Sequence, residues 1–551
     1  MLEGTMQNDF PLTVRHILHR LRGMYGDGEV VTLTDGAKAR ASYGELGERV
    51  DRLAGALRSL GVGPGDRVGT FCWNTQQHLE LYLAIPCMGA VLHTLNIRLF
   101  EEQLTYVVGH AQDKVIFLDD SLVPLLEKVL PKLEGVERYV VIGDGDTGSL
   151  PDPLRYEELL ADQEPGYDYP ELDERQAAGL CYTSGTTGNP KGVLYSHRST
   201  LLHSMGACLG NTLTVSASDR VMPVVPMFHA NAWGLPYASA LAGADLVMPG
   251  RFLQPEPLVK LIEEERVTVS AAVPTIWMDV LRYADENQPD LSSLRLVPCG
   301  GSAVPLALMK QFEERHGVRI LQAWGMTETS PLASVARPPV GAEGDEHWAF
   351  RDTAGRIAPL VEARVVADDG SVLPWDGKST GELEVRGPWI AASYYEDPSG
   401  DEKFDDGWLR TGDVASIDAK GFIRISDRAK DVIKSGGEWI SSVELEVQLM
   451  GHPAVREAAV IARPDERWSE RPLACVVAEE GEEPTPEELR EHLAGKLAKW
   501  QLPDAFAYID EVPKTSVGKF DKKVLRKRLE EGQLELHELG VPGQRKEEAR
   551  A

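Results

Sequence analysis

An eleven-residue stretch rich in glycine and hydroxyl side chains constrains this 551-residue chain more than any other feature. Residues 182–192 read Tyr-Thr-Ser-Gly-Thr-Thr-Gly-Asn-Pro-Lys-Gly, and the apolar residues 177–181 precede them. Glycines let the backbone turn sharply, and successive N–H groups in such a turn form a concave anion site. The hydroxyls add donors and Lys191 adds a positive charge. The stretch therefore predicts a loop after a short strand that holds a polyphosphate.

Two other interpretations of this loop can be weighed from its residues. The Walker pattern G-x-x-x-x-G-K-[ST] needs a second glycine five residues after Gly185, where Pro190 stands. It also needs a hydroxyl after Lys191, where Gly192 stands, so the Walker pattern does not apply. An ordinary surface turn remains open, because glycine, serine and threonine are common in turns.

The first 150 residues alternate between helical and strand-like patterns. Residues 42–60 form an amphipathic pattern in which Ser42 is a candidate N-cap and Glu45 completes a capping box. Short apolar runs at 68–71, 115–118 and 139–142 read as strands that follow helical segments. Such alternation predicts a mainly parallel sheet covered by helices, and the length predicts at least two domains.

His229 and Trp233 follow an apolar run that contains two prolines. A lone histidine beside apolar residues is more often structural than functional, and a tryptophan here could equally belong to a core. The residues alone leave both interpretations open.

A strand-to-helix turn is predicted at Gly300, Gly301 and Ser302. Many such turns bind nothing. Val304 excludes the G-x-S-x-G elbow of hydrolases, because it stands in place of the last glycine.

Residues 322–330, Gln-Ala-Trp-Gly-Met-Thr-Glu-Thr-Ser, are more informative. Trp324 offers a flat face for a base, Thr327 a hydroxyl, and Glu328 a hard oxygen ligand suited to Mg²⁺. An isolated Thr-Glu pair would equally suit the first turn of a helix.

Glycines and aspartates punctuate short strands over residues 355–422, which predicts a small β-rich subdomain. Residues 408–413 end in Asp413 after a tight turn. An aspartate can accept both hydroxyls of a ribose, although a turn aspartate is the plainer alternative.

Residues 426–442 are dense in charge and then in glycine, a composition that suits a junction between domains. The chain beyond has its own helix and strand pattern and predicts a small α+β domain. Lys519 follows a glycine in a loop, where a lysine is ordinarily solvated. From Lys522 we expect a charged helix and then a frayed end.

Taken in order, these stretches resemble the motifs of the adenylate-forming enzymes, the superfamily of acyl-CoA synthetases, luciferases and peptide-synthetase adenylation domains. The match is nearly letter for letter in residues 182–192 and weaker over almost the whole chain. Family members often have tyrosine where Trp324 stands. The resemblance implies that ATP or AMP is bound by Thr183, Ser184, Gly185, Thr186, Thr187, Gly188, Lys191, Gly300, Gly301, Ser302, Gln322, Ala323, Trp324, Gly325, Thr327, Asp413, Arg428, Lys434 and Trp439.

The resemblance implies further roles as well. It assigns the metal to Thr183 and Glu328, the hinge to Lys430 and the mouth of an acyl tunnel to Trp233. It also implies that Lys519, Thr327 and His229 are catalytic. Lys434, Gly436 and Gly437 would face coenzyme A.

The architecture expected from these observations is α/β and α+β. A large domain of helix-covered sheets with a β-rich subdomain would occupy residues 1–429, and a small mobile domain would occupy 430–530. Residues 531–551 would form a charged tail.

The implied reaction uses ATP, Mg²⁺ and coenzyme A, and has two halves. A fatty acid attacks the α-phosphorus of ATP, and the thiol of coenzyme A then attacks the acyl-adenylate. Residues around Trp233 and Trp439 look most like those of bacterial medium- to long-chain fatty acyl-CoA synthetases. A ligase for an aryl or short-chain acid, a peptide-synthetase adenylation domain and a nucleotide-binding regulator without catalysis are the alternatives.

The net charge of −29 disfavours nucleic acid and anionic lipid as partners, and it requires a local basic pocket for an anionic substrate. Six scattered cysteines, none in a C-x-x-C pair, favour a reducing compartment. With no visible signal peptide or spanning apolar segment, we expect a cytoplasmic protein. The resemblance allows a homodimer.

Overall fold

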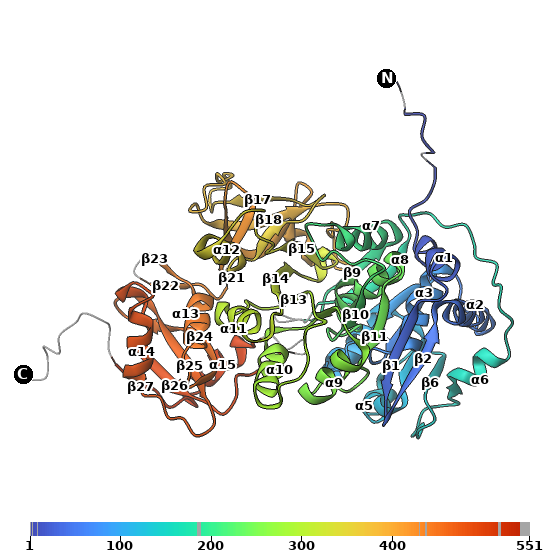
Figure 1. Cartoon of the computed structure of the whole chain (residues 1–551), viewed down its shortest axis with the longest axis horizontal. Coiled ribbons are helices and arrows are strands. Elements are labelled where there is room, and N and C mark those ends of the chain that lie inside the picture. Colours follow the sequence, from blue (N-terminus) through green and yellow to red (C-terminus); the bar gives the residue numbers. More distant parts are fainter. Residues whose placement is uncertain are drawn as a thin grey trace, which may run out of the picture.

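The computed structural model describes residue 2 and residues 4–7, 9–183, 189–428, 430–435, 438–515 and 520–539, apart from the side chains at 399, 401, 438 and 439. A large N-terminal domain holds three sheets and a smaller α+β domain follows it, as expected (Figure 1).

The sheet that carries residues 177–182 is largely parallel, as the alternating pattern predicts. Its order is β7-β6-β5-β3-β4-β8-β9, and only β9 runs antiparallel to its neighbour. The strands are β3 (Arg67–Phe71), β4 (Val91–Thr94), β5 (Asp113–Asp119), β6 (Arg138–Ile142), β7 (Leu154–Arg155), β8 (Ala177–Tyr182) and β9 (Gly192–Ser196). The helices of this part are α2 (Tyr43–Ser59), α3 (Gln76–Cys87), α4 (Glu101–Ala111), α5 (Val123–Leu126) and α6 (Tyr156–Ala161), with 3₁₀ turns η1 (Asp120–Leu122) and η2 (Leu130–Lys132).

A second sheet, in the order β12-β10-β11-β1-β2, packs beside the first. Its strands are β1 (Glu29–Thr34), β2 (Ala37–Ser42), β10 (Arg220–Pro223), β11 (Asp245–Met248) and β12 (Val269–Ala271). Its helices are α1 (Arg15–Met24), α7 (His197–Cys208), α8 (Leu235–Ala242), α9 (Pro255–Glu265) and α10 (Pro274–Asn287), with η3 (Ala230–Gly234) before α8.

Helix α3 joins the two sheets into one core. It contacts β1 of the second sheet and β3, β4 and β8 of the first. All but one of its residues are buried, which is the pattern of a helix enclosed on every side. The capping box predicted for α2 is present, because the Ser42 hydroxyl accepts from the Glu45 backbone N–H and the Glu45 carboxylate accepts from Ser42.

The predicted β-rich segment is present within the large domain, and its strands belong to a larger sheet. Its strands continue a nine-stranded sheet that begins with the parallel pair β13-β14 and passes through β15 into β16-β21-β20-β18-β17. The strands are β13 (Val297–Gly300), β14 (Ile320–Gly325), β15 (Leu332–Val335), β16 (Gly355–Ile357), β17 (Glu362–Val366), β18 (Gly381–Arg386), β19 (Phe404–Asp405), β20 (Trp408–Ile417) and β21 (Phe422–Arg428). Helices α11 (Leu306–His316) and α12 (Gly344–Arg351) and turns η4 (Thr327–Thr329) and η5 (Pro398–Lys403) belong to this part.

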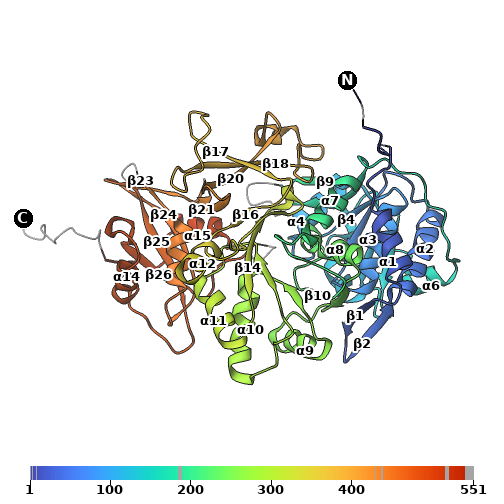
Figure 2. The same ribbon diagram turned by 45° about the horizontal axis from the view of Figure 1, so that its top comes forward.

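The smaller domain forms a six-stranded sheet in the order β23-β22-β25-β26-β27, with β24 beside β25. Its strands are β22 (Ile433–Ser435), β23 (Glu438–Ile440), β24 (Val455–Asp465), β25 (Ser469–Ala478), β26 (Ala505–Tyr508) and β27 (His537–Glu538). Its helices are α13 (Ser442–Leu449), α14 (Pro486–Ala494) and α15 (Lys522–Glu530), with turn η6 (Lys499–Gln501). Figure 2 shows this domain at one end of the molecule.

The expectation of a frayed end after α15 is wrong for its first part. Strand β27 pairs antiparallel with β26, and Leu534 and Leu536 pack against the core beside it. Leu534 and Leu536 alternate with polar residues, a strand pattern that the surrounding charges obscured. The packed chain thus continues beyond residue 530.

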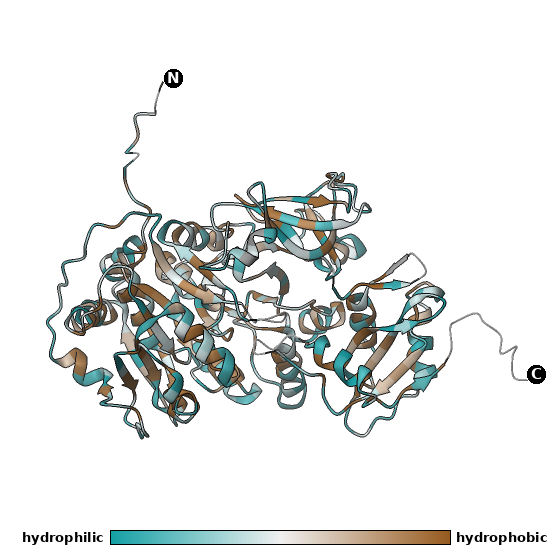
Figure 3. Ribbon diagram, turned by 180° about the vertical axis from the view of Figure 1, so that it is seen from behind, coloured by the Kyte–Doolittle hydropathy of each residue, from teal (hydrophilic) through white to brown (hydrophobic). Residues whose placement is uncertain are grey.

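The apolar residues gather within the layers. Figure 3 shows brown strands inside each domain and teal residues on the outer helices. No helix among the described residues is both long and apolar enough to cross a membrane.

Candidate active site

One large cavity, of about 1120 Å³, lies where the two domains meet. Residues of the large domain line most of it, and residues 430–450 and 501–522 of the smaller domain supply the rest. Part of the wall is apolar and the rest is polar. Apolar lining side chains include Leu213, Val224, Val225, Phe228, Leu253, Val273, Ile276 and Met278.

The predicted phosphate loop connects β8 to β9 as a hairpin. Tyr182 faces Gly192 across the pair. The Thr183 N–H donates to the Lys191 carbonyl at 2.9 Å, and the Lys191 N–H donates to the Thr183 hydroxyl at 3.0 Å. Both residues line the cavity. Ser184, Gly185, Thr186, Thr187 and Gly188 lie outside the described residues.

The Gly300–Ser302 turn and residues 322–325 come together because β13 and β14 are parallel neighbours. Gly300 pairs with Ala323, and a Cβ at Gly300 would lie 2.4 Å from the Ala323 carbonyl oxygen. Glycine is therefore required for this approach. The predicted adenine-binding residues that line the cavity are Gly301, Ser302, Gln322, Ala323, Trp324 and Gly325, whereas Gly300 is not a lining residue.

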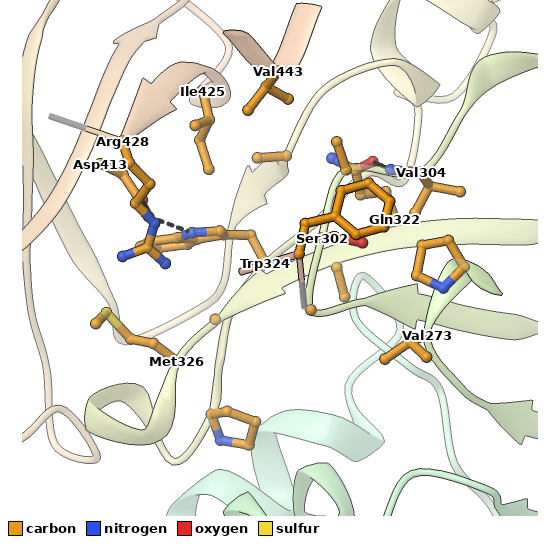
Figure 4. Close-up of a pocket in the computed structure, with 18 of the residues that line it drawn as sticks. Val273, Ser302, Val304, Gln322, Trp324, Met326, Asp413, Ile425, Arg428 and Val443 are labelled. Atoms are coloured by element: carbon orange, nitrogen blue, oxygen red, sulfur yellow. Dashed lines mark hydrogen bonds and ion pairs between the residues drawn. The ribbon is translucent and has the colours of Figure 1, made fainter. Parts of the chain in front are cut away.

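Asp413 joins two other residues that are predicted to bind the nucleotide. The Trp324 indole N–H donates to one carboxylate oxygen at 2.9 Å, and the Arg428 Nε lies 2.7 Å from the other (Figure 4). The Asp413 side chain is almost fully buried, with 3 % exposed. Each carboxylate oxygen keeps a further lone pair, so both can still accept a hydroxyl. In Figure 4 the Gln322 amide oxygen accepts from the Val304 N–H, at 2.8 Å.

Thr327 and Glu328 are buried and also line the cavity. The Tyr394 hydroxyl donates to Glu328 Oε1 at 2.6 Å. Burial and the adjacent Glu328 carboxylate raise the pKa of Tyr394 above its usual value, so its hydroxyl remains a donor at neutral pH. The Tyr195 hydroxyl donates to the Thr327 carbonyl at 2.7 Å.

His229 and Trp233 also line the cavity. Between them the backbone makes a left-handed turn, with φ from 41° to 57° at residues 230–233. Four successive non-glycine residues in this region are unusual and cost free energy. Asn231 holds the turn, since it accepts from the Tyr82 hydroxyl at 3.3 Å and from the Cys181 thiol at 3.2 Å. The Trp233 ring lies 3.6 Å from the position of a Cβ on Gly300.

Of the predicted hinge and the residues predicted to face coenzyme A, only some are shown to line the cavity. Lys430 lines it, and burial lowers the pKa of its ammonium group. Lys434 is exposed on β22 and is not a lining residue. Gly436, Gly437, the Trp439 side chain and Lys519 fall outside the described residues.

Buried charges connect the two sides of this junction. Ser442 donates to the Asp427 carboxylate through its N–H at 2.5 Å and its hydroxyl at 2.6 Å. Lys522 lies 2.7 Å from Glu446 and donates to the Ser442 hydroxyl at 2.5 Å. Burial raises the pKa of Glu446 to about 7. Burial alone would lower the pKa of Lys522, but the carboxylates of Glu446 and Asp427 raise it.

We expect Lys522→Met to destabilise the protein by about 3–5 kcal/mol, because it strips two buried carboxylates of their cation. Glu446 binds its proton more tightly in the folded chain, so it costs stability as the pH rises from about 4.5 to about 7. Urea unfolding at pH 5.5 and pH 8 should show the larger loss at pH 8. Lys527→Met, in the same helix but 72 % exposed, is the control. Equal stability of the two variants would contradict the prediction.

Sequence reasoning missed two residues of this cavity. Arg98 follows β4, which is the parallel neighbour of β8, so both chains leave the sheet at the same edge. Among the described residues the Arg98 guanidinium has no ion pair or hydrogen bond. The sequence signal that could have identified Arg98 was a lone basic residue just after a buried strand. Tyr394 carried none, because it lies in a loop of mixed residues.

The charge of the cavity differs from that of the whole chain. Its lining residues include eight lysines and arginines and seven aspartates and glutamates, whereas the chain carries −29. The lining is therefore nearly neutral and much less acidic than the whole chain. Across the part of the chain that the structure describes, three or more His, Cys, Asp or Glu side chains nowhere gather as a metal site.

Comparison with known families agrees with this geometry. The AMP-binding enzyme family matches residues 23–395, and the C-terminal domain of AMP-binding enzymes matches residues 444–519. The chain belongs to the AMP-binding enzyme family. This places it among the adenylate-forming enzymes that the motifs resemble.

Curated relatives of this AMP-binding enzyme match over nearly their whole length. A long-chain-fatty-acid–CoA ligase of Thermus thermophilus is 46 % identical, over 96 % of this chain and 98 % of the relative. A medium-chain-fatty-acid–CoA ligase of Ectopseudomonas oleovorans is 43 % identical, over 96 % of this chain and 97 % of the relative. A 3-methylmercaptopropionyl-CoA ligase of Ruegeria lacuscaerulensis is 44 % identical, over 94 % and 97 %.

Solved structures share the fold of this AMP-binding enzyme. The anthranilate CoA ligase AuaEII in complex with anthranoyl-AMP has a TM-score of 0.86 at 26 % identity, covering 96 % of this chain and 100 % of that one. ATP-bound MatB from Rhodopseudomonas palustris has a TM-score of 0.80 at 25 % identity, covering 94 % and 98 %.

Proposed function

We propose that this enzyme activates a fatty acid with ATP and transfers the acyl group to coenzyme A. The observation that carries the proposal is the single cavity that joins the residues predicted for adenine, ribose and phosphate to an apolar wall. Relatives named as long-chain and medium-chain fatty acid–CoA ligases, at 46 % and 43 % identity, support a fatty acid as substrate.

In the first half-reaction the acid carboxylate attacks the α-phosphorus of ATP and pyrophosphate leaves. This needs little covalent chemistry from the protein, so positioning and charge neutralisation provide the catalysis. Asp413 and Arg428 hold the ribose, Thr327 contacts the α-phosphate and His229 flanks the acyl-adenylate. Lys519 neutralises charge between the carboxylate and the α-phosphate, while residues 183–191 hold the β- and γ-phosphates.

The residues present fit a magnesium ion at the phosphate end. Glu328 is a buried carboxylate that lines the cavity, and the Thr183 hydroxyl lines it as well. Mg²⁺ usually keeps several waters and binds one or two carboxylates beside substrate phosphates, which agrees with so few protein ligands. Held by Glu328 and Thr183, Mg²⁺ would neutralise charge on the departing pyrophosphate.

In the second half-reaction the thiol of coenzyme A attacks the acyl-adenylate carbonyl and AMP leaves. We propose that the smaller domain, from residue 430 through strand β27, rotates about Lys430, which withdraws Lys519 and brings Lys434, Gly436, Gly437 and Trp439 to the cavity. The exposure of Lys434 away from the cavity supports a role that requires such movement. Arg98 supplies a cation for an anionic substrate.

The identity of the acid is tested by AMP formation, with and without coenzyme A, across acids from acetate to palmitate. Benzoate and 3-(methylthio)propionate belong in the panel, because one relative at 44 % identity is named for the latter acid. A short-chain acid is therefore the second candidate. Activity with benzoate alone would overturn the fatty-acid proposal, and absence of pyrophosphate release with every acid would favour a regulator.

We expect Trp233→Ala to favour longer acids, because the ring lies beside Gly300 and lines the cavity that contains the apolar wall, so its removal enlarges the space for the acid. The ratio of kcat/KM for palmitate to that for octanoate should rise about tenfold, which is the lower end of the effect of one methylene in an apolar pocket. Trp375→Ala, 42 % exposed, is the control. An equal loss for all acids would instead make Trp233 a core residue.

A cytoplasmic enzyme that assembles as a homodimer completes the proposal. Cell fractionation and analytical sedimentation test these two points separately.

A further inference from the structure

Tyr394 touches two groups from separate segments of the cavity. Its hydroxyl donates to Glu328 Oε1 at 2.6 Å, and the Lys191 ammonium lies 4.8 Å from the centre of its ring. Glu328 belongs to η4, whereas Lys191 ends the hairpin loop before β9. One side chain thus joins the predicted metal carboxylate to the predicted phosphate-binding lysine.

The backbone around Tyr394 is fixed to the same two segments. The Ala391 N–H donates to the Glu328 carbonyl at 2.7 Å, and the Tyr395 N–H donates to the Gly192 carbonyl at 2.8 Å. Residues 391–395 therefore bridge η4 and the start of β9. Tyr394 stands between these two hydrogen bonds, so its position follows both segments.

The ring is also packed on its other sides. Phe404 meets it edge to face, with 5.3 Å between centroids. A Cβ at Gly400 would lie 2.3 Å from the Tyr394 ring and 3.4 Å from the Lys191 ammonium, so only glycine allows this packing. Asp397 lies 3.2 Å from the same ammonium. The segment that follows Tyr394 thus packs against Lys191.

These contacts have two chemical consequences. With Oε1 fixed by the tyrosine, Glu328 presents its second oxygen in one orientation, and among the described residues no other side chain donates to this carboxylate. The aromatic face attracts the ammonium and limits its rotamers, which prepares Lys191 for a phosphate.

We propose that Tyr394 is a positioning residue for the phosphate end of the nucleotide site: its hydroxyl orients Glu328 for the metal, and its ring holds Lys191 for the phosphates. This inference rests on the proposed function, because that function assigns the metal to Glu328 and the phosphates to Lys191.

Two substitutions separate the two contacts. Tyr394→Phe removes the hydroxyl and keeps the ring, whereas Tyr394→Leu removes both. Tyr395→Phe is the matched control, since this neighbouring ring packs on His110. Calorimetric titration of ATP in the presence of EDTA reports metal-free binding. Pyrophosphate release across a Mg²⁺ series reports the metal requirement.

For Tyr394→Phe we expect the Mg²⁺ concentration for half-maximal release to rise about tenfold, as for a lost hydrogen bond to a charged group. Metal-free ATP affinity should stay within about twofold of that of the unaltered protein. Tyr394→Leu should show the same metal defect and, in addition, metal-free ATP binding weaker by about fivefold. Tyr395→Phe should change neither quantity.

An unchanged Mg²⁺ requirement in Tyr394→Phe would overturn the role of the hydroxyl, and unchanged metal-free binding in Tyr394→Leu would overturn that of the ring. Equal losses in both assays for Tyr394→Phe, with a lower Tm, would show a merely structural tyrosine. Failure of the proposed function is distinguishable, because then the unaltered protein itself would release no pyrophosphate.

Discussion

Lys519→Ala should abolish the formation of acyl-adenylate and largely spare the formation of thioester from a supplied acyl-adenylate. The ammonium group is proposed to neutralise charge only while the carboxylate approaches the α-phosphate. Removing one such group typically lowers kcat by about 10²–10³-fold. The rate of pyrophosphate release from ATP and acid measures the first half-reaction, and the rate of acyl-CoA formation from synthetic acyl-adenylate measures the second.

The control for this experiment is a lysine of the same segment. Lys514→Ala removes an exposed ammonium that pairs with Glu457 at 2.6 Å, and it should leave both rates within about twofold. If Lys519→Ala slows both half-reactions equally, then the smaller domain does not move between two positions, and the proposed rotation about Lys430 is wrong.

Asp413→Ala should impair both half-reactions, in contrast to Lys519→Ala. The carboxylate is proposed to hold the ribose of ATP and of the acyl-adenylate alike, and it also fixes Trp324 and Arg428. Its loss leaves the indole N–H without its acceptor and the guanidinium without its anion. We expect kcat/KM for ATP to fall about a hundredfold, as for a removed hydrogen-bonded charge.

Dissociation of a fluorescent adenylate analogue gives the second measurement, and it should accelerate by a similar factor. Asp405→Asn, which alters an exposed carboxylate on the neighbouring β19, is the control and should change neither value. Normal affinity for the adenylate in Asp413→Ala would leave Asp413 as a turn aspartate, the alternative that its sequence context also allowed.

Local patterns in the sequence predicted individual helices and strands well. The capping box of Ser42 and Glu45 depends only on residues three apart, and the apolar run before Tyr182 is long enough to be one strand. Such patterns can be recognised without knowing which distant segment packs against them. The parallel sheet followed from the alternation of strands and helices.

Pairing between distant strands could not be predicted in the same way. The continuation of β13-β14-β15 into the β-rich segment depends on which edges meet, and the sequence records only that each segment is strand-like. Strand β27 was missed because the leucines before it, Leu534 and Leu536, stand among polar and charged residues, and their partial burial depends on a core that distant strands and α15 build together.

The residues of the cavity differ in the same way in how far the sequence predicts them. Glycine-rich turns such as Gly300–Ser302 leave a local signature, because a side chain would collide with the neighbouring strand. Tyr394 leaves none and Arg98 only that of a lone cation after a strand, since their significance arises from how β9, η4 and the end of β4 are arranged. The role of such residues becomes visible only in the three-dimensional structure.

The buried charges at the junction bear on domain exchange between relatives. A chimera cut at residues 429–430 would join Asp427 from one parent to Ser442 and Lys522 from another, and these three residues form one hydrogen-bonded group. The Ser441 hydroxyl also donates to the carbonyl of Ser426, so the shared unit begins before the proposed hinge. Grafts that transfer residues from Ser426 onward keep this group from a single parent and are the ones expected to fold.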